Sequence, residues 1–236
     1  MLISKPPDYV AFSVTIPTGM IPTRRYGEWL MPMAVSSQHE SKTRLIEAAL
    51  SVIRTKGYSA STVEDICESA GLTKGSFFHH FRSKDDLALD AIRYWNTVNE
   101  KFFADAPFQQ QKDPLQRLFG YLNLRASILT DEIPEFTCLL GTLLQETHET
   151  HPEIRAACER GLATHVDELT RDLKAAKKRY APKATWSAEE VGYFIQGALQ
   201  GSFIFAKAKQ NSEAVRQTIT HLRRYLEFLF NRETAQ

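Results

Sequence analysis

An all-α fold is predicted by two features of this 236-residue sequence. First, apolar residues recur three and four positions apart in segment after segment, which is the period of a helix with one buried face. Second, no segment shows the strict alternation of apolar and polar residues that is typical of a half-buried strand. Start and stop signals divide the chain into about nine helices. We expect a small N-terminal head of three helices and a larger helical body.

Residues 1–38 are unlike the rest, because they have prolines at positions 6, 7, 17, 22 and 32 and no helical period. This composition predicts a disordered extension. Met31 or Met33 is a candidate for the true start of translation, and the intact mass of the natural product would decide. The alternative is a genuine flexible basic arm that carries Arg24 and Arg25.

The first helix is expected from about Ser41 to Lys56, and Gly57 stops it. Its inward face has helical spacing and comprises Leu45, Ile46, Ala49, Leu50 and Ile53.

The second helix has a capping box at its start. Ser61 or Thr62 can cap it, and Glu64 or Asp65 lies three residues on as the reciprocal partner. Gly71 ends this helix. A tight turn and a third helix are predicted directly after it.

The third helix begins at the cap Thr73, and Phe77 and Phe81, four apart, form its inner face. Gly75 is unexpected, because glycine inside a helix costs about 1 kcal/mol relative to alanine. Close approach to another backbone would offset that cost. Two short helices joined by a glycine turn, the second with a polar outer face and a glycine, are typical of a helix-turn-helix whose second helix lies in the DNA major groove.

At these positions the chain resembles the TetR/AcrR family of bacterial transcriptional regulators, over roughly residues 39–99, with the helix-turn-helix motif at 62–81. The matching residues are Ile66-Cys67, Ala70-Gly71-Leu72-Thr73, Gly75, Phe78, His80-Phe81, Lys84 and Leu87. The resemblance implies a DNA-binding head at 39–99 and a ligand-binding and dimerisation domain at 100–236. It also implies a homodimer on a palindromic operator that an unknown small-molecule effector releases.

Candidate DNA contacts lie at the start of the second helix, along the third and at the start of the fourth. They are Thr62, Thr73, Lys74, Gly75, Ser76, Phe78, His79, His80 and Lys84. The lysines could instead be solvated charges, the threonines only caps, and His80 a structural hydrogen-bonding residue. The family usually has tyrosine where this chain has Phe78, so one phosphate contact in each half-site is absent if the ring occupies that position.

The helices of the body begin at cap or proline signals, and they are expected from Ser83, Pro114, Phe136, Pro152, Ser187 and Ser212. The helix from Ser187 carries an unusual number of small residues, which indicates close helix packing. The resemblance implies that the last two helices form a four-helix dimer interface. Its candidate residues are Phe194, Gly197, Gly201, Leu222 and Leu226. The alternative is tight packing within one subunit.

An effector pocket is implied by the resemblance, and the body supplies aromatic and polar residues that could line one. The candidates are Tyr94, Trp95, Phe102, Phe119, Arg125, Gln145, His165 and Gln196. Aromatic residues at helical spacing can equally be ordinary core packing.

Composition limits the other function classes. The net charge is only +1, so DNA contact would use a local patch. Three cysteines argue against a disulfide framework and for a reducing, cytoplasmic setting. No apolar run approaches a membrane span of about 18 residues. We expect no cofactor, no metal site and no enzymatic activity, because no nucleophile, base and orienting group fall in a recognisable arrangement.

The sequence therefore favours a ligand-responsive, DNA-binding transcriptional repressor. One alternative is a DNA-binding structural or cell-division factor on the same fold, which would lack a pocket. Another is an electrophile or redox sensor acting through Cys138, which lies at a predicted helix N-terminus where thiolate chemistry is easier.

Overall fold

The computed structural model describes the backbone of residues 37–231, and over this range the protein contains ten α-helices, one short 3₁₀-helix and no strand. The all-α prediction is confirmed. Almost all of the predicted extension at 1–38 lies outside the described residues, and so do its candidate start sites and the predicted basic arm. Its last two residues, 37 and 38, belong to the first turn of α1. The helices are α1 (Ser37–Lys56), α2 (Val63–Ala70), α3 (Lys74–His80), α4 (Lys84–Ala104), η2 (Pro107–Gln110), α5 (Pro114–Ser127), α6 (Ile133–Phe136), α7 (Leu139–Thr147), α8 (Pro152–Tyr180), α9 (Ala188–Lys209) and α10 (Glu213–Asn231).

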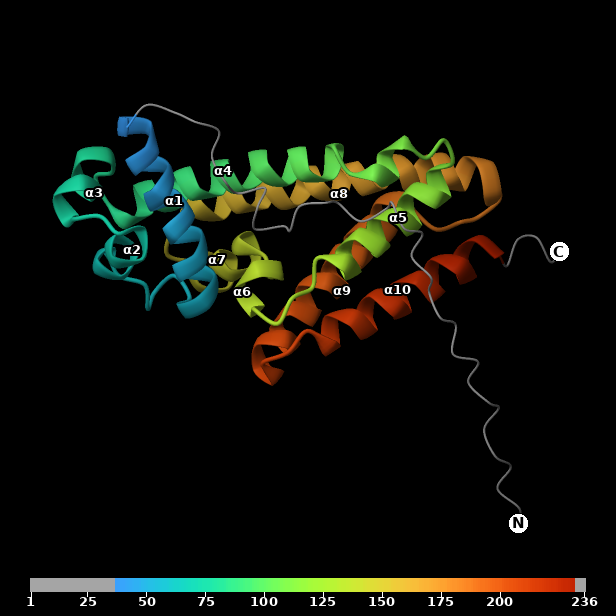
Figure 1. The fold of residues 1–236 in the computed structure, drawn as a ribbon. Coiled ribbons are helices and arrows are strands. Elements are labelled where there is room, and N and C mark those ends of the chain that lie inside the picture. Colours follow the sequence, from blue (N-terminus) through green and yellow to red (C-terminus); the bar gives the residue numbers. More distant parts are fainter. Residues whose placement is uncertain (1–36, 232–236) are drawn as a thin grey trace, which may run out of the picture.

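The helices form an elongated molecule with the head at one end (Figure 1). Helices α1 to α3 make up the head, and the long α4 runs from it along α8. Helices α9 and α10 pack together along the opposite side of the body and contact α8 and α5 respectively. Within the described range, none of these helices is both long and apolar enough to cross a membrane.

Local caps fix the head as the sequence predicts. Of the two alternatives at each position, Thr62 is the N-cap and Asp65 its partner: Thr62 Oγ1 accepts from Asp65 N at 3.1 Å, and Asp65 Oδ2 accepts from Thr62 N at 2.9 Å. Gly71 ends α2 in the left-handed conformation with φ 61°. Phe77 and Phe81 are buried together against α1 and α2.

The helix expected from about Phe136 to Glu149 begins later, at Leu139, because Phe136 ends a separate short helix, α6. Thr137 and Cys138 adopt extended backbone, with ψ of 157° and 124°, between α6 and α7. The break lets Phe136 and Leu139 both enter the core, while Thr137 and Cys138 line cavities of the body.

Head and body meet at the turn after α1. The carboxylate of Glu146, on α7, accepts the backbone N–H of Tyr58 at 3.0 Å and of Ser59 at 2.8 Å. Gly57 precedes this turn with φ 86°, and a β-carbon on it would lie 2.3 Å from Glu146 Oε1. Glycine is therefore required here by both the backbone angle and the contact. We call these two hydrogen bonds the Glu146 contact.

Candidate DNA interface and ligand cavities

The outer face of α3 is open to solvent over its whole length. Phe78 is 58% exposed, and Lys74, Gly75 and His79 are also exposed. A β-carbon on Gly75 would meet only Thr73 Oγ1, at 3.6 Å. Among the described residues, no neighbour therefore requires a glycine at this position. The exposed ring shows that Phe78 does not pack into the core of the head.

The two threonines among the DNA candidates both act as helix caps. Thr73 Oγ1 accepts from Ser76 N at 3.2 Å at the start of α3, and Thr62 caps α2. Both threonines are exposed, so capping leaves their outer surface open to solvent. Lys74 pairs with Glu64 of α2 on the surface, where both side chains are more than half exposed.

His80 and Lys84 are held within the head, in contrast to the other candidates. His80 Nε2 lies 2.7 Å from Ser41 Oγ on α1, and burial, the neighbouring His79 and Lys42 lower the pKa of His80. Lys84 Nζ donates to the carbonyls of Tyr58 and Ser61, each at 2.9 Å, and lies 4.2 Å from the centre of the Tyr58 ring. The structure thus favours the structural alternative for His80, which contacts α1. Lys84 is not the solvated charge that was the alternative for it, because it closes the turn before α2.

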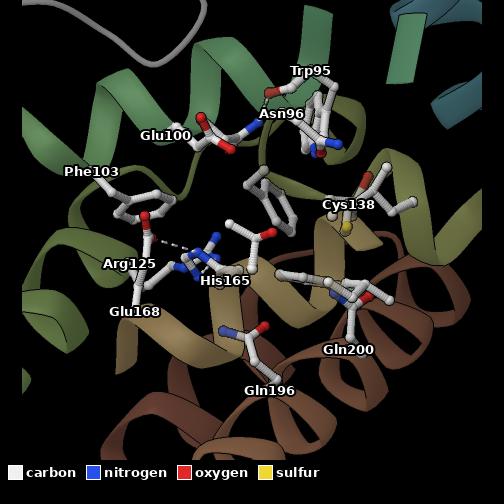
Figure 2. A pocket seen from close by; sticks show the side chains of 18 of the residues that line it. Trp95, Asn96, Glu100, Phe103, Arg125, Cys138, His165, Glu168, Gln196 and Gln200 are labelled. Carbon is white, nitrogen blue, oxygen red and sulfur yellow. Dashed lines mark hydrogen bonds and ion pairs between the residues drawn. The ribbon is translucent and has the colours of Figure 1, made fainter. Parts of the chain in front are cut away.

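The body contains a large cavity between α4, α7, α8 and α9 (Figure 2). It encloses about 650 Å³ of space, including its open mouth. Its lining is mostly apolar with several polar groups. Labelled residues in Figure 2 that converge on it include Trp95, Asn96, Phe103, Arg125, Cys138, His165, Gln196 and Gln200.

A hydrogen-bond network at one end of the large cavity fixes the protonation of His165. Arg125 Nη2 lies 3.2 Å from His165 Nε2, and because arginine has only donors, Nε2 must accept. The proton of the ring is then on Nδ1, 3.5 Å from a carboxylate oxygen of Glu168. Burial lowers the pKa of His165, against the opposing effect of Glu168, which agrees with a neutral ring.

Tyr121 joins this network to α9. Its hydroxyl oxygen accepts from Arg125 Nε at 3.0 Å and from Gln196 Nε2 at 2.9 Å, and it lies 3.1 Å from His165 Nε2, to which it donates. The guanidinium of Arg125 also lies 4.7 Å from the centre of the Phe103 ring. The wall that these residues form is therefore preorganised by its own contacts.

Other polar groups of the cavity have no such network. Within the described part of the chain, neither the Asn96 amide nor the Gln200 amide makes a hydrogen bond. A β-carbon on Gly161 would lie 2.6 Å from Asn96 Oδ1, and one on Gly141 would lie 2.3 Å from Gln200 Oε1. Two glycines on neighbouring helices thus make room for two amides that line the large cavity.

A smaller cavity adjoins the large one. Thr137, Cys138, Gln200 and Phe203 line both, and the small cavity adds residues of α7 and α9, including Lys207. It encloses about 350 Å³, including its mouth. The hydroxyl of Thr137 is buried and has no hydrogen-bond partner. Buried polar groups are normally satisfied, so this hydroxyl suggests a ligand group or water at this place.

Four of the predicted pocket residues line the large cavity, namely Trp95, Arg125, His165 and Gln196. The other four lie elsewhere. Tyr94 donates to Glu47 of α1, Phe102 is buried in the core, Phe119 packs under Arg223, and Gln145 reaches only the small cavity.

Residues that the sequence did not single out complete the lining, notably Asn96, Thr137, Glu168 and Gln200. The only sequence signal for two of them is the pair of helix-interior glycines, Gly141 and Gly161, opposite the amides. Helical glycines mark close approach, but they do not say what approaches.

The outward faces of α9 and α10 carry exposed aromatic residues. Phe194 is 50% exposed, and Tyr193, Ile204, Phe205 and Phe228 are exposed to a similar degree. A β-carbon on Gly197 or Gly201 would meet nothing within 4 Å, so close packing within this subunit does not explain these two glycines.

Leu222 and Leu226 are placed differently from the prediction. They are 2% and 1% exposed and pack within the subunit core, so the structure contradicts their assignment to a dimer interface. Both faces of α10 carry large apolar residues, and the helical period alone does not say which face turns inward. Gly192 also belongs to internal packing, since a β-carbon there would lie 2.8 Å from Thr170 Oγ1.

Among the described residues, no group of three or more histidine, cysteine, aspartate or glutamate side chains could hold a metal ion. The three cysteines are free thiols; Cys67 and Cys158 are buried, and Cys138 is partly exposed at the N-cap of α7.

Comparison with known proteins agrees with this architecture. Residues 45–91 match the family of bacterial regulatory proteins, tetR family. Residues 114–221 match the C-terminal domain of LmrA/YxaF-like transcriptional regulators. The two matches cover the head and most of the body in the order the fold requires. The chain belongs to the TetR family.

Individual TetR-family relatives support the same assignment. Transcriptional regulator AcuR of Cereibacter sphaeroides is 33% identical over 122 residues, which cover 52% of this chain and 54% of that protein. HTH-type transcriptional repressor DhaR of a Mycobacterium species is 21% identical over 76% of this chain and 88% of that protein. A crystal structure of regulatory protein TetR from Rhodobacter sphaeroides superimposes with a TM-score of 0.71 at 25% identity, over 80% of this chain and 98% of that one. The TetR-family assignment makes this chain a transcriptional regulator.

The contrast between Lys74 and Lys84 gives a first prediction. Lys84→Ala removes hydrogen bonds to two carbonyls, so we expect it to lower the free energy of unfolding by about 1–3 kcal/mol. Lys74→Ala removes only an exposed ion pair and should change stability by less than about 1 kcal/mol. When both variants are fully folded, we expect Lys74→Ala to lower DNA affinity more than Lys84→Ala does. Thermal unfolding and DNA titration of both variants check this, and equal melting temperatures would contradict the role given to Lys84.

Phe78→Tyr tests the outer face of α3. The exposed ring has room for a hydroxyl, which could donate to a phosphate where wild type makes no such bond. A hydrogen bond to a charged group contributes about 1.5–3 kcal/mol, so a dimer should bind its operator roughly tenfold tighter or more. Scrambled DNA should gain similarly, because phosphate contacts carry no sequence information. Unchanged affinity for both duplexes would show that the ring of residue 78 does not face the DNA backbone.

The neutral state of His165 predicts a pH dependence of stability. Its folded pKa is below the ordinary value of 6.5, so its contribution is complete above about pH 6.5 and is lost as the pH falls through the lowered folded pKa. The free energy of unfolding falls by about 1.4 kcal/mol for each pH unit by which the folded pKa lies below the unfolded one. Chemical denaturation from pH 7.5 to 5 should show a shallower decline for His165→Gln than for wild type. The exposed His221 provides the control, and His221→Gln should follow wild type.

Proposed function

We propose that this chain is a homodimeric repressor that acts in the cytoplasm, binds a pseudo-palindromic operator through α3, and is released when a small molecule enters its body. The observation that carries the DNA-binding part is the outer face of α3, where Gly75 has no internal neighbour and Ser76, Phe78 and His79 surround it. A glycine without an internal reason supports close approach of α3 to a groove. Thr62, Thr73 and Lys74 flank that face.

The dimer is proposed from the α9 and α10 surface. Exposed aromatic residues flank Gly197 and Gly201, and a contiguous apolar surface of this kind is typical of an interaction site. Two recognition helices that face the same side of a duplex require such a two-fold partner. The occupant we propose is a second copy of this chain.

Release by an effector is proposed from the large cavity and its neighbours. Trp95 lines the cavity, and the guanidinium of Arg54 on α1 lies 5.0 Å from the centre of its ring. Cys138 and Leu140 line the same cavity at the start of α7, whose far end makes the Glu146 contact. Two elements therefore run from the cavity to the head.

Genome-wide DNA binding tests the proposal against a structural or cell-division factor. A repressor should occupy few sites, including one beside its own gene, and deleting the gene should raise transcription there. Many sites without a transcriptional effect would contradict the proposal. The cavity favours the regulator, because a purely structural factor has no need of one.

A second candidate function is sensing of electrophiles or oxidants through Cys138. It is favoured by one observation, that Cys138 is the partly exposed cysteine and lines both cavities. Cys138→Ser should abolish the response to a thiol-reactive compound but leave release by a non-covalent effector unchanged. Equal responses of the two proteins would rule out this function.

The dimer surface gives a prediction with an internal control. Gly197→Leu meets open space within the subunit, so it should leave the fold intact, but it should weaken the dimer by about 1–3 kcal/mol through overpacking. Gly192→Leu collides with Thr170 and Val166 inside the subunit and should lower the melting temperature instead. Sedimentation and thermal unfolding separate the two effects. A Gly197→Leu protein that remains dimeric with normal operator affinity would contradict the proposed interface.

A further inference from the structure

The small cavity contains a lysine whose charge is not paired. Lys207 is partly buried on α9, and its ammonium donates to Thr142 Oγ1 at 2.8 Å. Within the described part of the chain it forms no ion pair. An ammonium has three donors, so two remain for other acceptors. Burial of a charge is unfavourable unless the charge is paired and hydrogen-bonded.

The acidic residue that acts on Lys207 already accepts two backbone hydrogen bonds. Glu146 influences Lys207 electrostatically, but its two oxygens accept the backbone N–H groups of Tyr58 and Ser59 in the Glu146 contact. Burial lowers the pKa of Lys207, although Cys138 and Glu146 act in the opposite direction. Glu146 therefore acts on this ammonium only at longer range, and no carboxylate among the described residues forms an ion pair with it.

A second, independent observation lies on the same wall. Thr137 is 1% exposed, and its buried hydroxyl has no hydrogen-bond partner. The residue lines both cavities. An unsatisfied buried hydroxyl and an unpaired ammonium beside one small cavity together require an acceptor. A carboxylate has two acceptor oxygens and one negative charge, so it can satisfy both groups.

We propose that the effector is a small carboxylic acid, whose carboxylate binds Lys207 and Thr137 in the small cavity while its apolar part occupies the large cavity. The inference rests on the proposed function, because it names the ligand class of that site. The large cavity offers Trp95, Phe103 and Phe136 to the apolar part. A single ammonium and a single hydroxyl suit a monoanion better than a phosphate dianion, which is usually bound by several donors or by arginine.

The position of the site also suggests how a bound ligand affects the DNA-binding head. A carboxylate at Lys207 competes with Glu146 for the same positive charge, and Glu146 holds the turn that precedes α2. Under this proposal, binding in the small cavity acts on the Glu146 contact through the electrostatic interaction between Lys207 and Glu146.

The test uses purified full-length protein without DNA and matched pairs of acid and amide: benzoate and benzamide, phenylacetate and phenylacetamide, hexanoate and hexanamide. A ligand that binds only the folded state raises the melting temperature with concentration. We expect at least one acid to do so, and its amide to bind about tenfold more weakly or worse, since a charged hydrogen bond is lost. Failure of every acid to stabilise wild type, or equal binding of acid and amide, would overturn the proposal.

Substitutions at Lys207 and Thr137 test whether the acid binds in the small cavity. Lys207→Gln should reduce affinity for the acid about tenfold or more, whereas Lys209→Gln, at an exposed lysine on the same helix, should bind as wild type does. Thr137→Val should weaken acid binding while leaving the melting temperature of the free protein unchanged or higher, because it removes an unsatisfied buried hydroxyl. A purely structural role for Thr137 would not produce that combination.

Three results would count against the carboxylate site. Lys207→Gln could retain full acid affinity, or it could sediment as a monomer, which would assign Lys207 to the subunit interface. Inorganic phosphate could also stabilise wild type through Lys207 as well as the acids do, which would indicate a general anion site. A separate arm measures release from the operator found by genome-wide binding. An acid that binds through Lys207 but does not release DNA would leave the site standing and contradict the proposed function.

Discussion

The Glu146 contact is the constraint on which the arrangement of head and body depends. One carboxylate on α7 receives two backbone N–H groups from the turn after α1, and Gly57 allows the turn to approach it. Although burial alone would raise the pKa of Glu146, hydrogen bonds from Ser59 and Tyr58 and the charge of Lys207 lower it. The contact is therefore a charged one. Lys84 binds the carbonyls of the same turn, so the start of α2 is held from both sides.

This arrangement places the cavities and the DNA-facing helices on shared elements. The N-terminal end of α7 lines both cavities, and its C-terminal end carries Glu146, so the two are separated by a helix of only 9 residues. Helix α4 carries Trp95 at the large cavity and begins at Lys84 beside α2. A short rigid helix transmits displacement better than a loop does. Under the proposed function, a ligand needs to shift only α7 or α4 to change the position of the head.

Local chemistry made the head predictable from the sequence, whereas the cavity depends on contacts between distant segments. Caps such as Thr62 and Thr73 act within four residues, and the capping box at Asp65 is visible as a spacing. Tyr94 and Trp95 are adjacent in the sequence, yet one bonds to α1 and the other lines the cavity, because a helix turns by 100° between them. The role of Lys84 could not be predicted from the sequence either, because the carbonyls to which it donates belong to residues 23 and 26 positions away.

The helical glycines divide into two classes that the sequence cannot separate. At Gly120, Gly141, Gly161 and Gly192 a β-carbon would lie less than 3 Å from a neighbouring side chain, so these glycines are explained inside the subunit. At Gly75, Gly197 and Gly201 the space is open. All seven weaken their helices by about the same amount, and for the second class nothing among the described residues offsets that cost. Those three glycines lie on α3, which we propose contacts DNA, and on α9, which we propose contacts a second subunit. Under the proposed function, DNA and a second subunit would occupy the open space beside these three glycines.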